Sequence, residues 1–152
     1  MLELRQLVTD DISFIGHTLQ QTMGWGPKKI IKAVKFMCVN KPVGLVLTSG
    51  NEPVGFMLYK EDKKTGANVI KLIVVIPAHR RKGGALAMLE CPIKEYLKQG
   101  VTIPFEARIS EDNLPAQMLF RKAGFKFRGY SDEKLIFRYS FVDEAVRKKQ
   151  QL

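Results

Sequence analysis

The chain has 152 residues, of which 45% are hydrophobic and 26% charged, as expected of one globular domain with a core. No apolar run approaches the roughly 20 residues that a membrane-spanning helix needs, so we expect no membrane segment. A net charge of +10 favours polyanionic or phosphorylated partners, such as nucleic acid, a ribosome, anionic lipid or a phosphorylated cofactor, without choosing among them.

The two cysteines, Cys38 and Cys91, lack the spacing of a metal site and give no disulfide framework. The first residues lack the basic start and long apolar stretch of a signal peptide. We therefore expect a cytoplasmic protein with reduced thiols and no bound metal.

The N-terminal third predicts one strand and two helices. Residues 2–7 alternate as a strand does, and Thr9 then offers a capping hydroxyl to a first helix. Pro27 suits the first position of a second helix. The apolar stripes predicted for the two helices are Ile12, Ile15 and Leu19, and Ile30, Ile31, Val34 and Cys38. The lysines predicted on or beside the solvated face of the second are Lys28, Lys29, Lys32 and Lys35.

The middle of the chain predicts an anion site. Residues 43–49 and 54–59 form a hairpin around a turn at 50–53, and residues 69–77 are a β-branched run that ends at a proline, as a buried central strand would. Three cations and two glycines follow at residues 80–84, and then an amphipathic helix. Glycines let the backbone approach a ligand, and the free amides at a helix start favour negative charge. An ordinary basic turn is the alternative.

The C-terminal part predicts a strand at 102–109, a helix capped by Asn113 that ends at Gly124, and a hairpin of residues 125–130 and 135–141. Residues 142–152 form a short basic tail. The order β-α-α-β-β-β-α-β-α-β-β indicates a single mixed α/β domain over residues 1–152.

Two segments resemble the general N-acetyltransferase (GNAT) superfamily. Arg80-Arg-Lys-Gly83-Gly-Ala85 resembles its acyl-CoA loop, and Asn113 to Phe125 resembles its later helix with the turn that follows. The resemblance implies a mostly antiparallel sheet of six to seven strands, flanked by about four helices, with strands four and five splayed apart. It also implies transfer of an acetyl group from acetyl-CoA to a primary amine by direct attack in a ternary complex.

The resemblance also implies a set of cofactor-binding residues. The loop would hold the coenzyme A pyrophosphate, the strand before it would bond the pantetheine arm, and Asn113 would reach towards the thioester besides capping its helix. The residues concerned are Ile73, Val74, Val75, Arg80, Arg81, Lys82, Gly83, Gly84, Ala85, Asn113 and Phe120.

Two departures from the family pattern matter. Phe120 stands where the family often has a Tyr that protonates the departing thiolate. Water, another residue or positioning alone must then serve. Tyr130 and Tyr139 are candidate acids, and a structural role as strand aromatics is the alternative for each. Pro92 is the second departure and should kink or restart the helix after the loop.

Pro104 would lie either at the gap between the splayed strands or at the start of the fifth strand.

Phe-Glu106-Ala-Arg108 resembles the Leu-Glu-Val-Arg strand of the branch that acetylates protein N-termini, such as ribosomal-protein alanine, where that Glu is the general base. Glu106 is therefore the candidate base; a surface ion pair or a solvated strand face is the alternative. Trp25 stands at the acceptor-binding loop of the family, and a core anchor is the alternative there.

The resemblance favours a protein or peptide N-terminus, or a lysine, as the acceptor. The charge leaves open an enzyme of this fold that acts on aminoacyl-tRNA or nucleic acid. Phe120 leaves open a non-catalytic module that binds coenzyme A. A homodimer is a further expectation.

Overall fold

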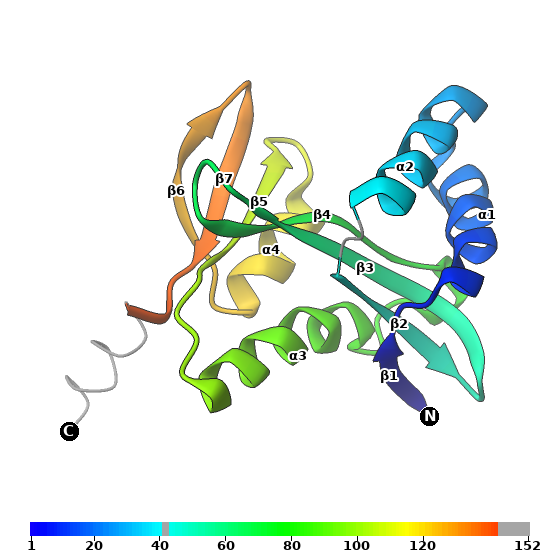
Figure 1. Cartoon of the computed structure of the whole chain (residues 1–152), viewed down its shortest axis with the longest axis horizontal. Coiled ribbons are helices and arrows are strands. Elements are labelled where there is room, and N and C mark those ends of the chain that lie inside the picture. Colours follow the sequence, from blue (N-terminus) through cyan, green and yellow to red (C-terminus); the bar gives the residue numbers. More distant parts are fainter. Residues whose placement is uncertain (41–42, 143–152) are drawn as a thin grey trace. The chain divides into compact units, whose positions relative to one another are not determined.

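The computed structural model describes residues 1–40 and 43–142; the predicted basic tail beyond Val142 lies outside them. Seven strands form a sheet in the order β1-β2-β3-β4-β5-β7-β6 (Figure 1). The elements are β1 (Leu2–Gln6), η1 (Thr9–Asp11), α1 (Ile12–Met23), α2 (Pro27–Asn40), β2 (Val43–Ser49), β3 (Glu52–Asp62), β4 (Ala67–Val75), η2 (Pro77–His79), α3 (Gly84–Gln99), β5 (Phe105–Ser110), α4 (Leu114–Lys122), β6 (Lys126–Ser131) and β7 (Lys134–Tyr139). This order confirms the mixed α/β class predicted from the sequence. None of these helices is long and apolar enough to cross a membrane.

The splay of the fourth and fifth strands is confirmed. β4 and β5 run parallel, and their pairing among the described residues is limited to Asn68 with Phe105 and Val69 with Glu106. The amide of Asn68 also bonds the carbonyl of Pro104, 2.8 Å away. Pro104 thus precedes the strand, where its missing N–H costs no ladder bond.

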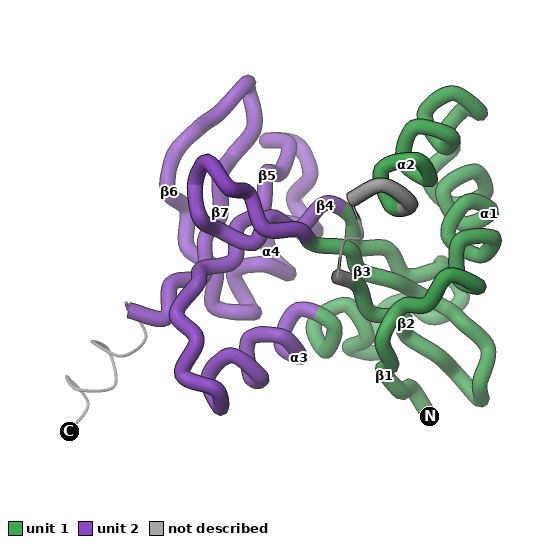
Figure 2. Tube along the Cα trace, in the orientation of Figure 1, with its two compact units in different colours: residues 1–59, 72–88 green, residues 60–71, 89–152 purple. Residues whose placement is uncertain are grey.

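The chain divides into two compact units (Figure 2). Unit 1 contains Met1–Tyr59 and Leu72–Met88, and unit 2 contains Lys60–Lys71 and Leu89–Leu152. β3, β4 and α3 each contribute residues to both units.

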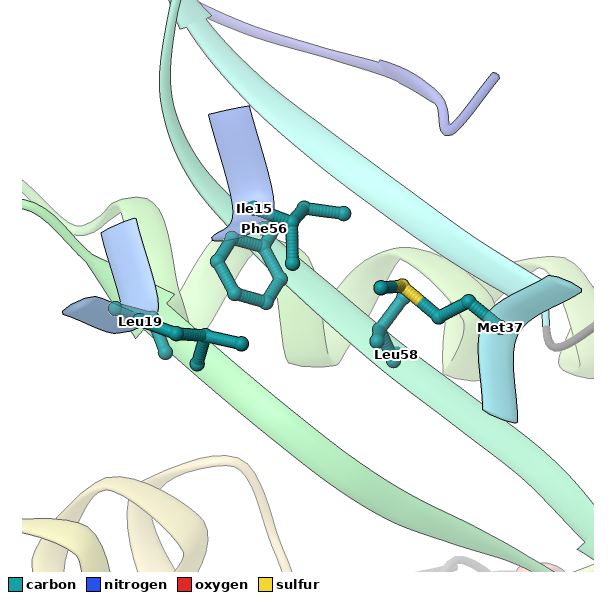
Figure 3. Close-up of a cluster of buried hydrophobic side chains, with 6 residues drawn as sticks. Ile15, Leu19, Met37, Phe56 and Leu58 are labelled. Atoms are coloured by element: carbon teal, nitrogen blue, oxygen red, sulfur yellow. The ribbon is translucent and has the colours of Figure 1, made fainter. Parts of the chain in front are cut away.

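In unit 1, α1 and α2 pack on one face of β3 and β4. The buried cluster between them consists of Ile15, Leu19, Met37, Phe56, Leu58 and Val74 (Figure 3). Ile30, Ala33 and Val34 of α2 pack against it. Ile31, which the sequence predicts in the apolar stripe, is exposed, because Ala33 and Met37 lie nearer the centre of the buried face. The side chain of Cys38 lies outside the described residues.

In unit 2, a chain of aromatic rings fills the core beside α3 and α4. Its members, each within 6.5 Å of the next by ring centroid, are Tyr96, Phe105, Phe141, Tyr139, Phe125 and Phe120. The side chain of Asn68 donates a 2.9 Å hydrogen bond to the hydroxyl of Tyr96, which satisfies a buried amide on the same face.

Three local predictions are wrong. The hairpin turn is not the four residues 50–53, because Gly50 and Asn51 alone form it, with φ of +56° and +74°; two positive φ values are typical of the tight turn that suits twisted strands. Of the two alternatives for Pro92, the restart of the helix is wrong, because α3 runs unbroken from Gly84 to Gln99.

The third wrong prediction is the cap of the first helix, because the carboxylate of Asp11, not the hydroxyl of Thr9, organises the chain there. It accepts two hydrogen bonds from Arg5, at 2.7 and 2.9 Å, and one from the amide of Val8 at 2.8 Å. The bonds from Arg5 lower the pKa of Asp11; burial opposes this effect, and the amide of Val8 lowers the pKa further.

Candidate functional site

The loop between β4 and α3 lies entirely in unit 1 and is shaped by its backbone. β4 ends at Val75, the short helix η2 follows, and α3 begins at Gly84. Within the loop, Arg81 has a φ of +64° and Gly83 a φ of +80°. Left-handed backbone of this kind is easy for glycine and costs a side-chain-bearing residue about 1 kcal/mol. The loop therefore holds a strained arginine three residues before the start of the helix.

Gly84 starts α3 where no side chain fits. It is buried, and a Cβ at this position would overlap Cδ2 of Leu47 on β2. Leu47 is itself buried, so any shift of its side chain must displace its neighbours in the packed core. Glycine at this position therefore lets the first turn of the helix lie directly on the sheet.

The start of α3 has the properties of an anion site. The first backbone hydrogen bond of α3 runs from the amide of Ala87 to the carbonyl of Gly83, 3.0 Å away. The amides of residues 84–86 have no carbonyl one turn earlier in the helix. Among the described residues, no atom lies within 4 Å of the position that a Gly83 Cβ would take. Open space, free amides and the helix dipole together suit a phosphate group.

The cations of the loop have different roles. Nε of Arg80 donates a 2.9 Å hydrogen bond to the carbonyl of Val75, so this side chain folds back on the end of β4. Arg81 and Lys82 are exposed. Nδ1 of His79 is buried without a hydrogen-bond partner among the described residues. Arg80 thus supports the loop, and it is exposed to solvent like the two cations that follow it.

Glu106 lies in unit 2 and is 3% exposed. It stands directly opposite Arg138 of β7, whose Nη2 and Nε both donate to its Oε2, at 2.6 and 3.1 Å. The predicted alternative of a solvated strand face is wrong, because this carboxylate is buried. An ion pair is present, but its partner is Arg138 and not the exposed Arg108 on the same strand.

The other sequence-predicted residues of unit 2 have structural explanations. Asn113 caps α4 through a 3.2 Å bond from the amide of Ala116. Phe120 is 3% exposed and meets the ring of Phe125 edge-on at 5.0 Å. Tyr130 is 65% exposed on β6, and Tyr139 is buried in the aromatic core.

Trp25 lies in unit 1, after the helix-ending Gly24, whose φ is +66°. It packs against the buried cluster, and Nζ of Lys29 stands 4.0 Å from the centre of its ring. The core-anchor interpretation of Trp25 accounts for these contacts.

The structure brings some of the predicted residues together. The loop from Arg80 to Ala85 and the strand residues Ile73–Val75 lie side by side in unit 1, joined by the bond from Arg80. Glu106, Asn113, Phe120 and Tyr130 belong to unit 2. Sequence reasoning missed Arg138 and Leu47; the first could be found by pairing the predicted strands at 102–109 and 135–141, and the second has no local signal.

Comparisons with known proteins identify the family. Residues 17–125, more than half of the chain, match the profile of the Acetyltransferase (GNAT) family. No curated protein sequence matches the chain.

Solved structures share its fold. A GNAT-family protein from Desulfovibrio desulfuricans is 17% identical with a TM-score of 0.77, over 92% of this chain and 99% of that one. PaiA N-acetyltransferase from Thermoplasma acidophilum, in complex with coenzyme A, is 13% identical with a TM-score of 0.75, over 93% and 99%. The ribosomal-protein-S18-alanine N-acetyltransferase from Escherichia coli is 20% identical with a TM-score of 0.72, over 92% and 94%. By its sequence profile and its fold, the chain belongs to the GNAT acetyltransferase family.

Proposed function

We propose that this protein transfers an acetyl group from acetyl-CoA to the primary amine of a protein or peptide. The observation that carries the proposal is the start of α3, where Gly84 lies on the sheet, the amides of residues 84–86 have no acceptor within the helix, and the space beside Gly83 is open. The residues present fit a pyrophosphate, because unpaired amides at a helix N-terminus bind phosphate oxygens. Family membership supports the same ligand.

In this proposal the loop and the end of β4 position the acetyl thioester, which acetyl-CoA supplies when bound. The amides of residues 84–86 bind the pyrophosphate, and Arg81 and Lys82 add positive charge. The carbonyl of Val75 is already bonded to Arg80, so the remaining backbone groups of Ile73–Val75 would bond the pantetheine arm.

Glu106 is the proposed general base. Arg138 holds its Oε2 from across the strand pair, and Oε1 would accept a proton from the amine, directly or through water. The amine nitrogen bonds to the acetyl carbon, the carbon–sulfur bond breaks, and the thiolate takes up a proton. Because Phe120 has no hydroxyl, water supplies that proton, and positioning carries the rest of the acceleration.

The acceptor class rests on the strand around Glu106, which resembles that of enzymes that acetylate protein N-termini. Two other candidates have one observation each. The charge of +10 favours an aminoacyl-tRNA or nucleic-acid acceptor, and the buried Phe120 favours a non-catalytic module that binds coenzyme A. A thiol-release assay separates the three functions. Release with peptide amines supports the proposal, release with aminoacyl-tRNA supports the nucleic-acid acceptor, and release with neither supports the non-catalytic module.

The experiment is calorimetric titration of acetyl-CoA into Gly83→Asp and Gly66→Asp proteins. Gly66 is the matched control, because its φ of +70° is close to the +80° of Gly83 and its surroundings are equally open. Both variants bear the same backbone strain, but only Gly83→Asp places a carboxylate at the anion site. We expect Gly83→Asp to weaken binding by about 100-fold or more and Gly66→Asp to bind as the parent does. Absence of binding by the parent would refute the proposal.

A further inference from the structure

One exposed surface of unit 2 remains outside the proposed function. It follows α4 and the adjacent edge of β6, and we call it the α4 strip. Four large apolar side chains lie on it, each between 43% and 71% exposed: Leu114, Met118, Phe127 and Tyr130. Large apolar side chains that are exposed to water and gather on one surface mark an interaction site.

Helical spacing and ring contacts relate the exposed side of α4 to the rings of β6. Leu114 and Met118 are one helical turn apart, and Arg121 follows on the same side of α4. The guanidinium of Arg121 lies 5.2 Å from the ring centre of Phe137. Phe137 in turn stands 6.1 Å from Phe127 by ring centroid.

The other end of the connection is Tyr130, whose ring meets that of Phe127 edge-on at 5.4 Å. An irregularity in the pairing of β6 with β7 lies between Phe127 and Gly129. It leaves Phe127 opposite Phe137 and Tyr130 opposite Leu135, so both rings project on the face that α4 covers in part.

The charges of the α4 strip are segregated. Arg121 and Lys122 are exposed at the C-terminal end of α4. At the other end, Glu111, Asp112 and Glu133 line one pocket together with Ser110. The two ends are about 15 Å apart along the helix. One end is therefore cationic, the other is anionic, and the centre is apolar.

We propose that the α4 strip is the interface of a symmetric homodimer. Under a two-fold axis through its apolar centre, Met118 and Tyr130 of two copies meet, and each cationic end faces the anionic end of the other copy. A two-fold interface must be self-complementary, and a strip with opposite charges at its ends meets that condition. A polyanion such as RNA would be repelled at the anionic end, which disfavours it as the occupant. Pairing of β6 with β6 of a second copy is disfavoured, because the irregularity between Phe127 and Gly129 distorts this edge strand.

Charge reversal tests the proposal. We expect the parent to be dimeric by analytical ultracentrifugation. Lys122→Glu and Asp112→Lys, each alone, should weaken the dimer by about tenfold or more, because each change places like charges together twice. The double variant should recover the dimer, since exchange of the two ends keeps the strip self-complementary. An equimolar mixture of the two single variants should likewise form a heterodimer.

The controls are Lys94→Glu, an exposed lysine on α3 of the same unit, which should leave the dimer unchanged, and circular dichroism, which should show every variant folded. A monomeric parent, or a dimer that both reversals leave intact, overturns the proposal. Oligonucleotide binding that weakens with Lys122→Glu and strengthens with Asp112→Lys would identify a polyanion as the occupant and also overturn it. None of these outcomes depends on acetyl-CoA, so they are independent of the proposed function.

Discussion

The anion-site loop of unit 1 and the buried carboxylate of unit 2 are built in different ways. The loop before α3 is a backbone structure, in which Gly83 adopts a left-handed φ and Gly84 admits a helix directly on β2. The carboxylate at Glu106 is a side-chain structure, held by an arginine 32 residues later in the chain. The loop depends on the absence of side chains, and the carboxylate depends on one particular side chain. Mutations should therefore affect them in opposite ways: added atoms damage the loop, and removed charges damage the pair.

The largest expected effect is on catalysis. Glu106→Gln keeps an oxygen that accepts from Arg138 but removes the proton acceptor, so we expect kcat to fall by about 100- to 10,000-fold. Binding of acetyl-CoA should not change. The measurement is thiol release under saturating acceptor, with Glu95→Gln, an exposed carboxylate on α3, as the control. An unchanged kcat would rule out Glu106 as the base.

The ion pair itself should be costly to break from one side. Arg138→Leu leaves the buried Glu106 carboxylate without its partner, and we expect the free energy of unfolding to fall by about 3 kcal/mol. Glu106→Leu together with Arg138→Leu should recover most of that loss, because it removes the buried charge as well. Urea denaturation of the three variants measures both effects. Equal losses in the single and double variants would show that packing of Arg138, and not its charge, stabilises the strands.

On the loop, the prediction is that one added methyl group destabilises. Gly84→Ala forces Leu47 to shift in a packed core, and we expect a loss of about 1–3 kcal/mol in the free energy of unfolding. In a Leu47→Ala background, Gly84→Ala should cost little further stability, so the double-mutant cycle should show strong coupling. Gly83→Ala, with open surroundings, should cost only its backbone strain and show no coupling with Leu47.

The smallest effect concerns a second side-chain pair, Asp11 with Arg5 in unit 1. Because the folded state lowers the pKa of Asp11, the pair stabilises fully above the unfolded pKa, near 3.9. This stability is lost as the pH falls through the folded pKa, so the loss begins below about pH 4. Asp11→Asn should lower the free energy of unfolding at pH 7 by about 1 kcal/mol and flatten its dependence on pH in the acid range. Asp10→Asn, on an exposed neighbour, should keep the parent's profile.

The same distinction explains what could be predicted from the sequence. The loop at residues 80–85 was recognisable because glycines and a following amphipathic helix are local signals. The strand predicted at residues 102–109 overlaps β5, because the alternation of apolar residues is also a local signal. The partner of Glu106 was missed because cross-strand register is a long-range property. Ile31 was assigned to the buried face of α2 because apolar residues surround more than one possible centre of that face. Asn51 was not recognised as a turn residue with positive φ, which lengthened the predicted turn by two residues.

The brief pairing of β4 with β5 has a consequence for hydrogen exchange. β5 pairs with β7 from Phe105 to Ser110, whereas its described pairing with β4 ends at Val69 and Glu106. Amide protons of residues 107–110 that point to β7 should exchange slowly, and those that point the other way should exchange quickly, so protection should alternate along a single strand. Mass spectrometry with residue resolution would record this alternation in the free protein, and its loss on addition of acetyl-CoA would report occupancy without any assay of turnover.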